Sequence, residues 1–204
     1  MSEAVSAVIG LVGVAVGAGI TWWQATSERS REKRADAQYL AIRVVCILDK
    51  YVVDCATACD DRTEMDEPGI NVWVSAPAAA LADYPVDVDW RCIESGLMFD
   101  ILSLPRDELL AKNWLAGYEE ATGCLIDEFA VERAKRYGGL GLEAAALAER
   151  LRTAYSIPAI KHGEWKPVEH IKLYFKEQEK LAQARAEAFA KLDPPPPPPP
   201  ALVK

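Results

Sequence analysis

An uncharged, apolar run from Ala4 to Trp23 constrains this chain more than any other feature. A helix of about 20 residues spans about 30 Å, the thickness of the hydrocarbon core of a bilayer. The run lacks the polar stripe of a core helix, and it lacks the basic segment and cleavage site of a secretory signal. Trp22 and Trp23 end the run, and indole rings favour the membrane interface. We therefore expect a transmembrane helix over residues 4–23.

The charges that flank this run predict its orientation. Lysine and arginine in excess mark the cytoplasmic side of a membrane helix. We therefore expect a single-pass protein of the inner (cytoplasmic) membrane, with residues 1–3 outside and the C-terminal domain in the cytoplasm. The expected partner is the lipid bilayer, and the expected membrane-interface residues are Trp22, Trp23, Arg29, Arg31, Lys33 and Arg34.

Small residues recur every three or four positions inside the run, and they include one GxxxG motif. Small side chains let two helix backbones approach closely in lipid, so the stripe predicts a homodimer through the transmembrane helix. The alternative is that glycine and alanine are simply frequent in membrane helices. The stripe consists of Ser6, Gly10, Gly13, Gly17 and Thr21.

Charge and cysteine content limit the other partners. The net charge of −8 argues against nucleic acid, because phosphate contacts require a basic face. The chain has five cysteines and no CxxC motif, which is typical of reduced thiols in the cytosol. These are Cys46, Cys55, Cys59, Cys92 and Cys124.

Helical periodicity continues from Ser27 to about Cys59 without a breaker, so the apolar run and this segment are expected to form one long rod. An apolar stripe along it is expected to pack against the rest of its own domain, with a short coiled coil as the alternative. The stripe consists of Leu40, Val44, Ile47, Tyr51 and Cys55.

We expect an all-α fold in which this rod packs with about four further helices. The chain divides into an external N-terminus (1–3), a membrane helix (4–23), a juxtamembrane and first cytoplasmic helix (24–61), an irregular acidic and proline-containing loop (62–89), a helical domain (90–192) and a polyproline tail (193–204). The segment INVWV in the loop is predicted to be extended without a partner strand.

Breakers and caps predict the later helices. Pro105 separates the first two, and the glycine pair at 138–139 is expected to kink or interrupt the third. Pro167 suits the first position of the last helix, whose charged second half is expected to project from the domain or lie on its surface. The predicted helices are Trp90–Leu104, Asp107–Tyr118, Cys124–Tyr155 and Pro167–Leu192.

Seven consecutive prolines follow this helix, from Pro194 to Pro200. Such a run forms a stiff polyproline II rod that suits aromatic-lined grooves of partner proteins. The candidate partner-binding residues are Pro194, Pro197 and Pro200. The alternative is a stiff spacer or a solvated tail.

No motif predicts catalysis, a cofactor or a metal. The GxGxxA match at 139–144 follows a charged helical stretch and lacks the strand that a dinucleotide site requires. His162-Gly-Glu164 lacks the PCxxC half of a zinc deaminase signature. Cys55 and Cys59, one helical turn apart, are interpreted as core residues and not as ligands. We therefore expect no catalytic, cofactor-binding or metal-binding residues.

The apolar N-terminus, the segment YLAIRVVCILDKYVVDC and the later segment DVDWRCIESGLMFDILSLP resemble small proteins of bacterial phage and prophage genomes. That group has no established activity, so the resemblance implies only a phage or bacterial setting.

Three functions follow as hypotheses. The first is a membrane-anchored, non-enzymatic helical domain that binds an unknown protein partner in the cytoplasm. The second is a spanin-like lysis protein with a periplasmic C-terminal domain. The third is an enzyme whose site lies in the loop from Asp60 to Asp89, because loops on a rigid scaffold often carry sites.

Overall fold

The computed structural model describes residues 2–60, 62–67, 70–74, 77–122, 126–160 and 163–192, with the backbone alone for residues 2–21, 25, 62–67, 70–74, 122, 126, 127 and 192. The fold is all-helical apart from one small hairpin, as expected. Three long helices follow the first in these residues, where about four were expected. The long helices are α1 (Ser2–Thr57), α2 (Ser95–Thr122), α3 (Ile126–Tyr155) and α4 (Pro167–Leu192).

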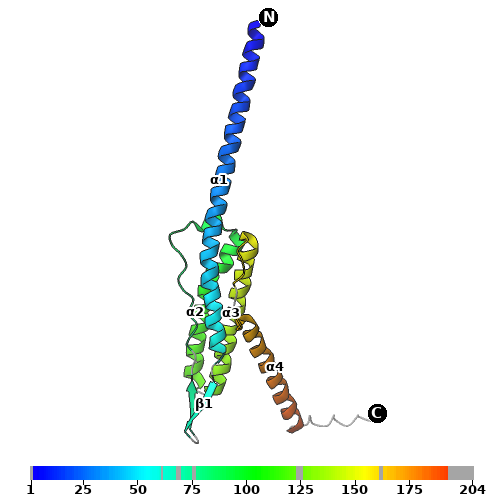
Figure 1. The fold of residues 1–204 in the computed structure, drawn as a ribbon. Helices are drawn as coiled ribbons and strands as arrows, with labels where there is room; N and C mark the ends of the chain where they lie inside the picture. Colours follow the sequence, from blue (N-terminus) through cyan, green and yellow to red (C-terminus); the bar gives the residue numbers. More distant parts are fainter. Residues whose placement is uncertain are drawn as a thin grey trace, which may run out of the picture.

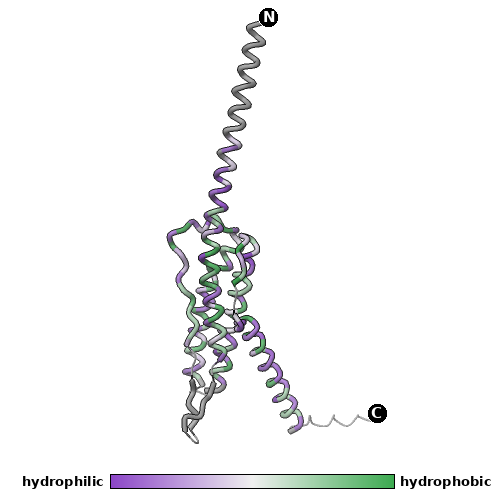
Figure 2. The backbone as a smooth tube through the Cα atoms, in the orientation of Figure 1, coloured by the Kyte–Doolittle hydropathy of each residue, from purple (hydrophilic) through white to green (hydrophobic). Residues whose placement is uncertain are grey.

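Helix α1 is one continuous rod whose second half packs beside α2 and α3 (Figure 1). Four of the five residues of the predicted stripe face this bundle: Leu40, Val44 and Cys55 are 0% exposed and Tyr51 is 1% exposed. The fifth, Ile47, is half-buried. Packing within the chain's own domain is therefore confirmed. Above the bundle, the part of α1 with described side chains is hydrophilic (Figure 2).

The expected membrane localisation is wrong. Within the described residues, no helix combines the length and the apolarity needed to cross a bilayer. In the described side chains of α1 above the bundle, charges from Glu28 to Asp36 recur every one or two positions and are exposed. The side chains of residues 4–21, which carry the predicted run, lie outside the described set.

The segment predicted to be an irregular loop contains a β-hairpin. Strand β1 (Arg62–Glu67) pairs antiparallel with β2 (Ile70–Val74), and the register sets Thr63 opposite Trp73. The prediction that INVWV lacks a partner strand is therefore wrong. The polar, acidic sequence of β1 hides the pairing, because it lacks the apolar alternation that usually marks a strand.

After the hairpin, residues 77–94 run back along the bundle as a strap that packs on α1 and α2 (Figure 1). The backbone N–H of Leu81 donates to Glu108 Oε1 on α2 at 2.9 Å. Arg43 on α1 holds Asp87 at 2.8 Å. Near its end, the strap contains the short 3-10 helix η2 (Trp90–Cys92).

Helix α2 runs straight through Pro105, where two separate helices were expected. A proline inside a helix cannot donate to the carbonyl four residues earlier, here that of Ile101. Tyr84 of the strap supplies the missing donor, because its Oη lies 3.1 Å from the Ile101 carbonyl oxygen. A contact distant in sequence therefore compensates for the local break.

Helix α3 also continues through the glycine pair at 138–139, so the expected interruption is wrong. At Gly141 an added Cβ would lie 2.7 Å from Cys55 Cβ and 2.9 Å from Ile171 Cδ1. At Gly138 it would lie 2.8 Å from Phe175 Cζ. The two glycines therefore let α1 and α4 approach the α3 backbone closely.

Candidate binding surfaces

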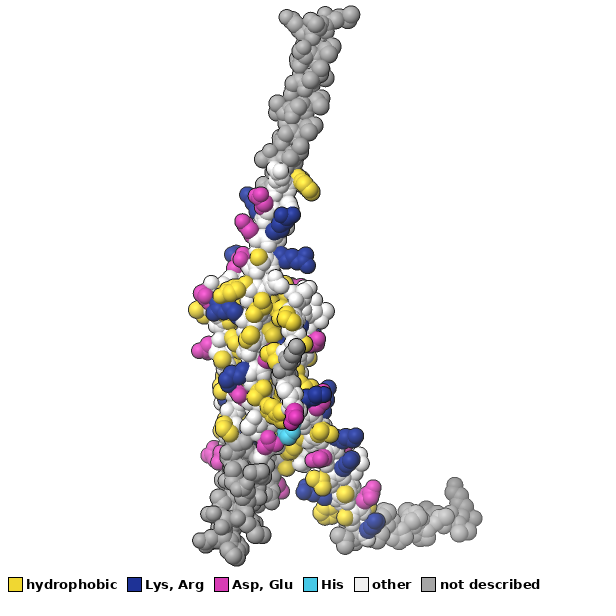
Figure 3. Space-filling view, in the orientation of Figure 1, with side chains coloured by type: hydrophobic (Ala, Val, Ile, Leu, Met, Phe, Trp, Pro, Cys, Tyr) yellow, Lys and Arg dark blue, Asp and Glu magenta, His cyan; other side chains and the backbone are white. Residues whose placement is uncertain are grey.

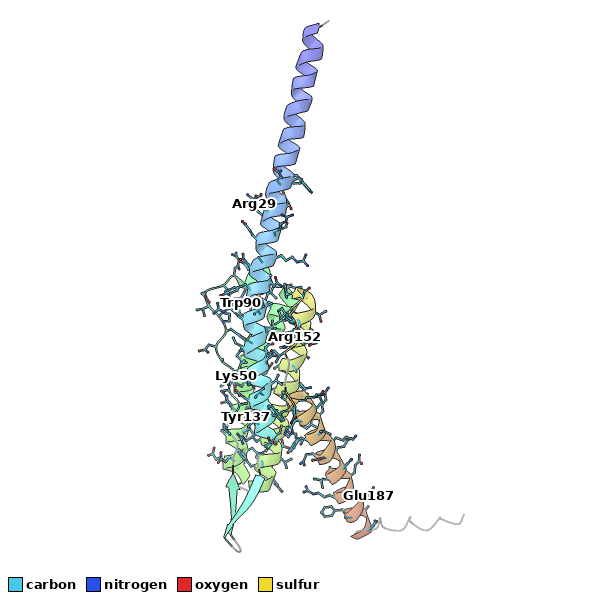
Figure 4. The ribbon with its side chains drawn as sticks, viewed as in Figure 1. Arg29, Lys50, Trp90, Tyr137, Arg152 and Glu187 are labelled. Carbon is cyan, nitrogen blue, oxygen red and sulfur yellow. The ribbon has the colours of Figure 1, made fainter. Side chains whose placement is uncertain are left out.

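Among the described residues, the most buried ion pair joins α3 to α1. Arg152 Nη2 on α3 donates to both carboxylate oxygens of Asp49 on α1 at 2.6 Å, and the two side chains are only 11% and 10% exposed. A small cavity beside the pair is also lined by Glu149, Ile160 and Val168. Because the two charges neutralise each other, this pair serves to hold α1 on α3. Figure 4 labels Arg152 in the bundle.

Two buried side chains of α1, Tyr51 and Cys55, are held in their neutral forms. Burial raises the pKa of the Tyr51 hydroxyl and of the Cys55 thiol. Since the thiolate is the nucleophilic form, Cys55 is an inert core residue. Burial also raises the pKa of Tyr84, which keeps its hydroxyl hydrogen for the Ile101 carbonyl.

The residues considered as metal ligands remain separate. Cys59 Sγ lies 3.4 Å from the Cys55 carbonyl oxygen and 3.7 Å from that of Ala134, so it packs against α3. His170 lies beside Asp60 at 2.8 Å, on the part-exposed edge of α4. Among the described side chains, no three histidine, cysteine, aspartate or glutamate residues are placed to hold a metal.

The GxGxxA match lies in the middle of α3, where Gly141 serves helix packing and a Cβ on Gly139 would meet nothing within 4 Å. His162 of the HxE match lies outside the described residues.

Two carboxylates in the loop to which the enzyme hypothesis assigned the site are engaged by arginines. Hydrogen bonds from Arg43 lower the pKa of Asp87, and hydrogen bonds from Arg91 lower the pKa of Asp89. Asp89 Oδ1 also accepts from the Arg91 backbone N–H at the start of η2. In the described part of this loop, these two carboxylates fix the strap and the start of η2.

The predicted interface residues lie on the part of α1 that extends past the bundle. Trp22 and Trp23 are 72% and 70% exposed. The basic residues Arg29, Arg31, Lys33 and Arg34 are exposed as well, and Figure 4 labels Arg29 above the bundle.

Two groups of predicted site residues fall outside what the structure describes. The first group is the small-residue stripe, for which only the backbone is described, so association through it stays a prediction. The stripe consists of Ser6, Gly10, Gly13, Gly17 and Thr21. Residues 193–204 are also outside, so the roles of Pro194, Pro197 and Pro200 stay predictions.

Helix α4 begins at Pro167 and ends at Leu192, as predicted. Its first half packs on the bundle through Ile171, which is 0% exposed. Residues 179–191, here called the arm, are all exposed and lead away from the bundle (Figures 1 and 3). Leu181 and Phe189 are 50% and 71% exposed on the arm. The projection of the second half is therefore confirmed.

A second apolar surface was missed by the sequence analysis. Helix α2 also exposes Trp114, whose ring stacks on Tyr118 and lies under the Arg136 guanidinium. Its other four exposed large hydrophobic residues lie opposite the buried face; this outer stripe consists of Phe99, Leu102, Leu109 and Leu110. Dividing the segment at Pro105 hid the stripe, because each half then showed only two of its members. A single helix through Pro105 would have revealed two apolar faces.

Comparisons with known proteins returned no relative: the chain matches no family model, no curated protein and no solved structure.

Proposed function

We propose that this protein is a non-enzymatic binding protein whose arm captures a protein partner. The observation that carries this proposal is the continuity of one apolar face of α4 from the bundle into solvent. Phe189 lies 18 residues after Ile171, which is five helical turns, so the two side chains point in the same direction from the helix axis. Ile171 is fully buried and Phe189 is 71% exposed.

The chemistry of the arm suits recognition of a groove. Leu181 and Phe189 lie eight residues apart, which places them about 80° from each other on the helix surface, so both can enter one apolar groove. Exposed charges surround them, including Glu187 near the free end (Figure 4), and they keep the unbound arm solvated. The proline run that follows Leu192 in sequence would extend this contact as a polyproline ligand.

The structural contacts of the buried charged side chains support a non-enzymatic role. Asp49 neutralises Arg152, and Glu108 accepts from the strap and from Lys112 at 3.0 Å. These groups stabilise helix contacts. The phage or bacterial setting implied by the resemblance stays a prediction.

Site-specific photocrosslinking tests the proposal. A photoreactive amino acid placed at Leu181 or Phe189 should yield one discrete crosslinked species in cells. Placed at Leu173, it should yield none, because Leu173 is 58% exposed but lies in the first half of α4, before the arm. Equal crosslinking at all three positions, or none at any, would refute capture by the arm.

A substitution series adds the matched control. L181D and F189D should abolish the crosslink formed at the other arm position, while L173D should leave it unchanged. A chain that ends at Leu192 then measures the contribution of the prolines, and we expect weaker but detectable crosslinking.

A further inference from the structure

Opposite charges face each other across a cleft between α3 and the arm. A cavity of about 280 Å³ lies where the arm leads away from α3 (Figure 1), and Arg185 of the arm forms one of its walls. Arg185 and Glu128 are both exposed, and in the described part of the chain neither of them forms an ion pair. The other lining residues are Tyr118 of α2 and, from α3, Glu128, Val131 and Glu132.

Helices α3 and α4 are antiparallel where they touch. A Cβ added to Gly138 of α3 would lie 2.8 Å from Phe175 Cζ of α4, and one added to Gly141 would lie 2.9 Å from Ile171 Cδ1. Phe175 follows Ile171 along α4, whereas Gly138 precedes Gly141 along α3. The two helices therefore run in opposite directions from this contact.

The opposite charges of the cleft keep the register of this contact. Arg185 lies ten residues after Phe175, and Glu128 lies ten residues before Gly138. Because both helices rise 1.5 Å per residue, the two side chains stand at the same level across the cleft.

A small residue of the arm stands opposite an apolar residue of α3 in the same register. Ala182 lies seven residues after Phe175, and Val131 lies seven residues before Gly138. Seven residues are almost two helical turns, so both point toward the neighbouring helix as Phe175 and Gly138 do. The sequence of α4 therefore continues a helix contact beyond the point where the described helices separate.

We propose that the arm closes on α3, with Arg185 paired to Glu128 and Ala182 packed on Val131, and that the described position is the open one. Closure requires no break in α4. Long helices curve with radii of about 60–100 Å, and over the roughly 25 Å from Phe175 to Leu192 such curvature moves the free end by about 3–5 Å. Rotation of the Arg185 side chain adds to this reach.

Closure gives the arm an internal competitor for its partner. Phe189 points in the same direction from the helix axis as Ile171, so the closed arm turns Phe189 toward α3. This consequence rests on the proposed function, whereas closure itself does not. Because Arg185 and Glu128 are both exposed, their pairing favours the closed position by about fivefold at most, and the two positions exchange.

Distances between two spin labels on the full chain test closure. Labels carried by noncanonical amino acids at Glu120 of α2 and Ala190 of the arm leave the five cysteines and the proposed contact unchanged. At low ionic strength the wild-type chain should show two distances, the shorter one from the closed arm. R185E should reduce the shorter population about fivefold, and so should E128R. The double variant with both changes should restore it, because the two charges are then exchanged.

A control on the opposite side of the arm completes the test. Lys180 lies nine residues after Ile171, which is two and a half turns, so K180E should leave both populations unchanged. Circular dichroism should show wild-type helix content in every variant. A single distance in the wild-type chain would overturn closure, and so would a shorter population that persists in R185E or fails to return in the double variant. Failure of the proposed function differs from these results, since the arm would then crosslink to no partner while both distances remained.

Discussion

Helices α2 and α4 each carry apolar residues that are exposed, yet the chain holds them in different ways. Helix α2 is fixed along its length, with α3 and the strap on its inner face and a tyrosine replacing the bond that Pro105 removes. Helix α4 packs on the bundle in its first half, where the glycines of α3 allow close contact, and every residue of its arm is exposed. The comparison shows that an apolar stripe in the sequence predicts which face of a helix can be buried. How much of that face is buried depends on how closely the neighbouring helices approach.

The largest effect should come from the fixed half of α4. Ile171→Ala removes a fully buried side chain and leaves a cavity between α1, α3 and α4. We expect a loss of about 3 kcal/mol in the free energy of unfolding, measured by urea denaturation. A loss below about 1 kcal/mol would mean that α4 is not part of the cooperative fold.

A smaller loss of stability should follow from adding a methyl group at Gly141, where α3 contacts α1 and α4. Gly141→Ala places a Cβ 2.7 Å from that of Cys55, so α1 must shift, and we expect a cost of about 2 kcal/mol. Gly139→Ala is the matched control, because its Cβ meets nothing within 4 Å. The control should stabilise the helix by up to about 1 kcal/mol. Equal effects from both variants would contradict close packing at Gly141.

The hydrogen bond from Tyr84 to the Ile101 carbonyl, which compensates for Pro105, gives a third prediction. Tyr84→Phe leaves the Ile101 carbonyl without its donor, and we expect a cost of about 1–2 kcal/mol by urea denaturation. Pro105→Ala restores a backbone N–H at position 105. In that background Tyr84→Phe should cost clearly less, and an unchanged cost would contradict the compensation.

The arm should contribute least to stability. Leu181→Ala and Phe189→Ala replace side chains that are 50% and 71% exposed, so each should change the free energy of unfolding by no more than about 0.5 kcal/mol. Thermal unfolding of the two variants beside Ile171→Ala measures the difference between the halves of α4. A large loss from either arm variant would show that the arm packs on the domain.

Local patterns were sufficient to predict much of the fold. The stripe from Leu40 to Cys55 gave the buried face of α1, because helical spacing alone identifies it. Pro167 gave the start of α4, because proline suits the first position of a helix.

The features that were missed depend on contacts distant in sequence. The continuity of α2 depends on Tyr84, which lies 17 residues before Ile101, and the use of Gly138 and Gly141 in α3 depends on side chains of α1 and α4 that pack against them. The hairpin depends on a polar strand without an apolar signature. The projecting arm could be predicted from its charged sequence. The outer stripe could not be predicted, because Pro105 was interpreted as the end of a helix and the stripe crosses that position.

Native-state hydrogen exchange of the purified chain tests the central claim, that α4 is fixed in its first half and free in its second. Amides of residues 172–176 should exchange only through global unfolding, as those of α2 on both sides of Pro105 should. Amides of residues 182–190 should exchange orders of magnitude faster, because the arm opens without disturbing the bundle. Equal protection along the whole of α4 would contradict the account.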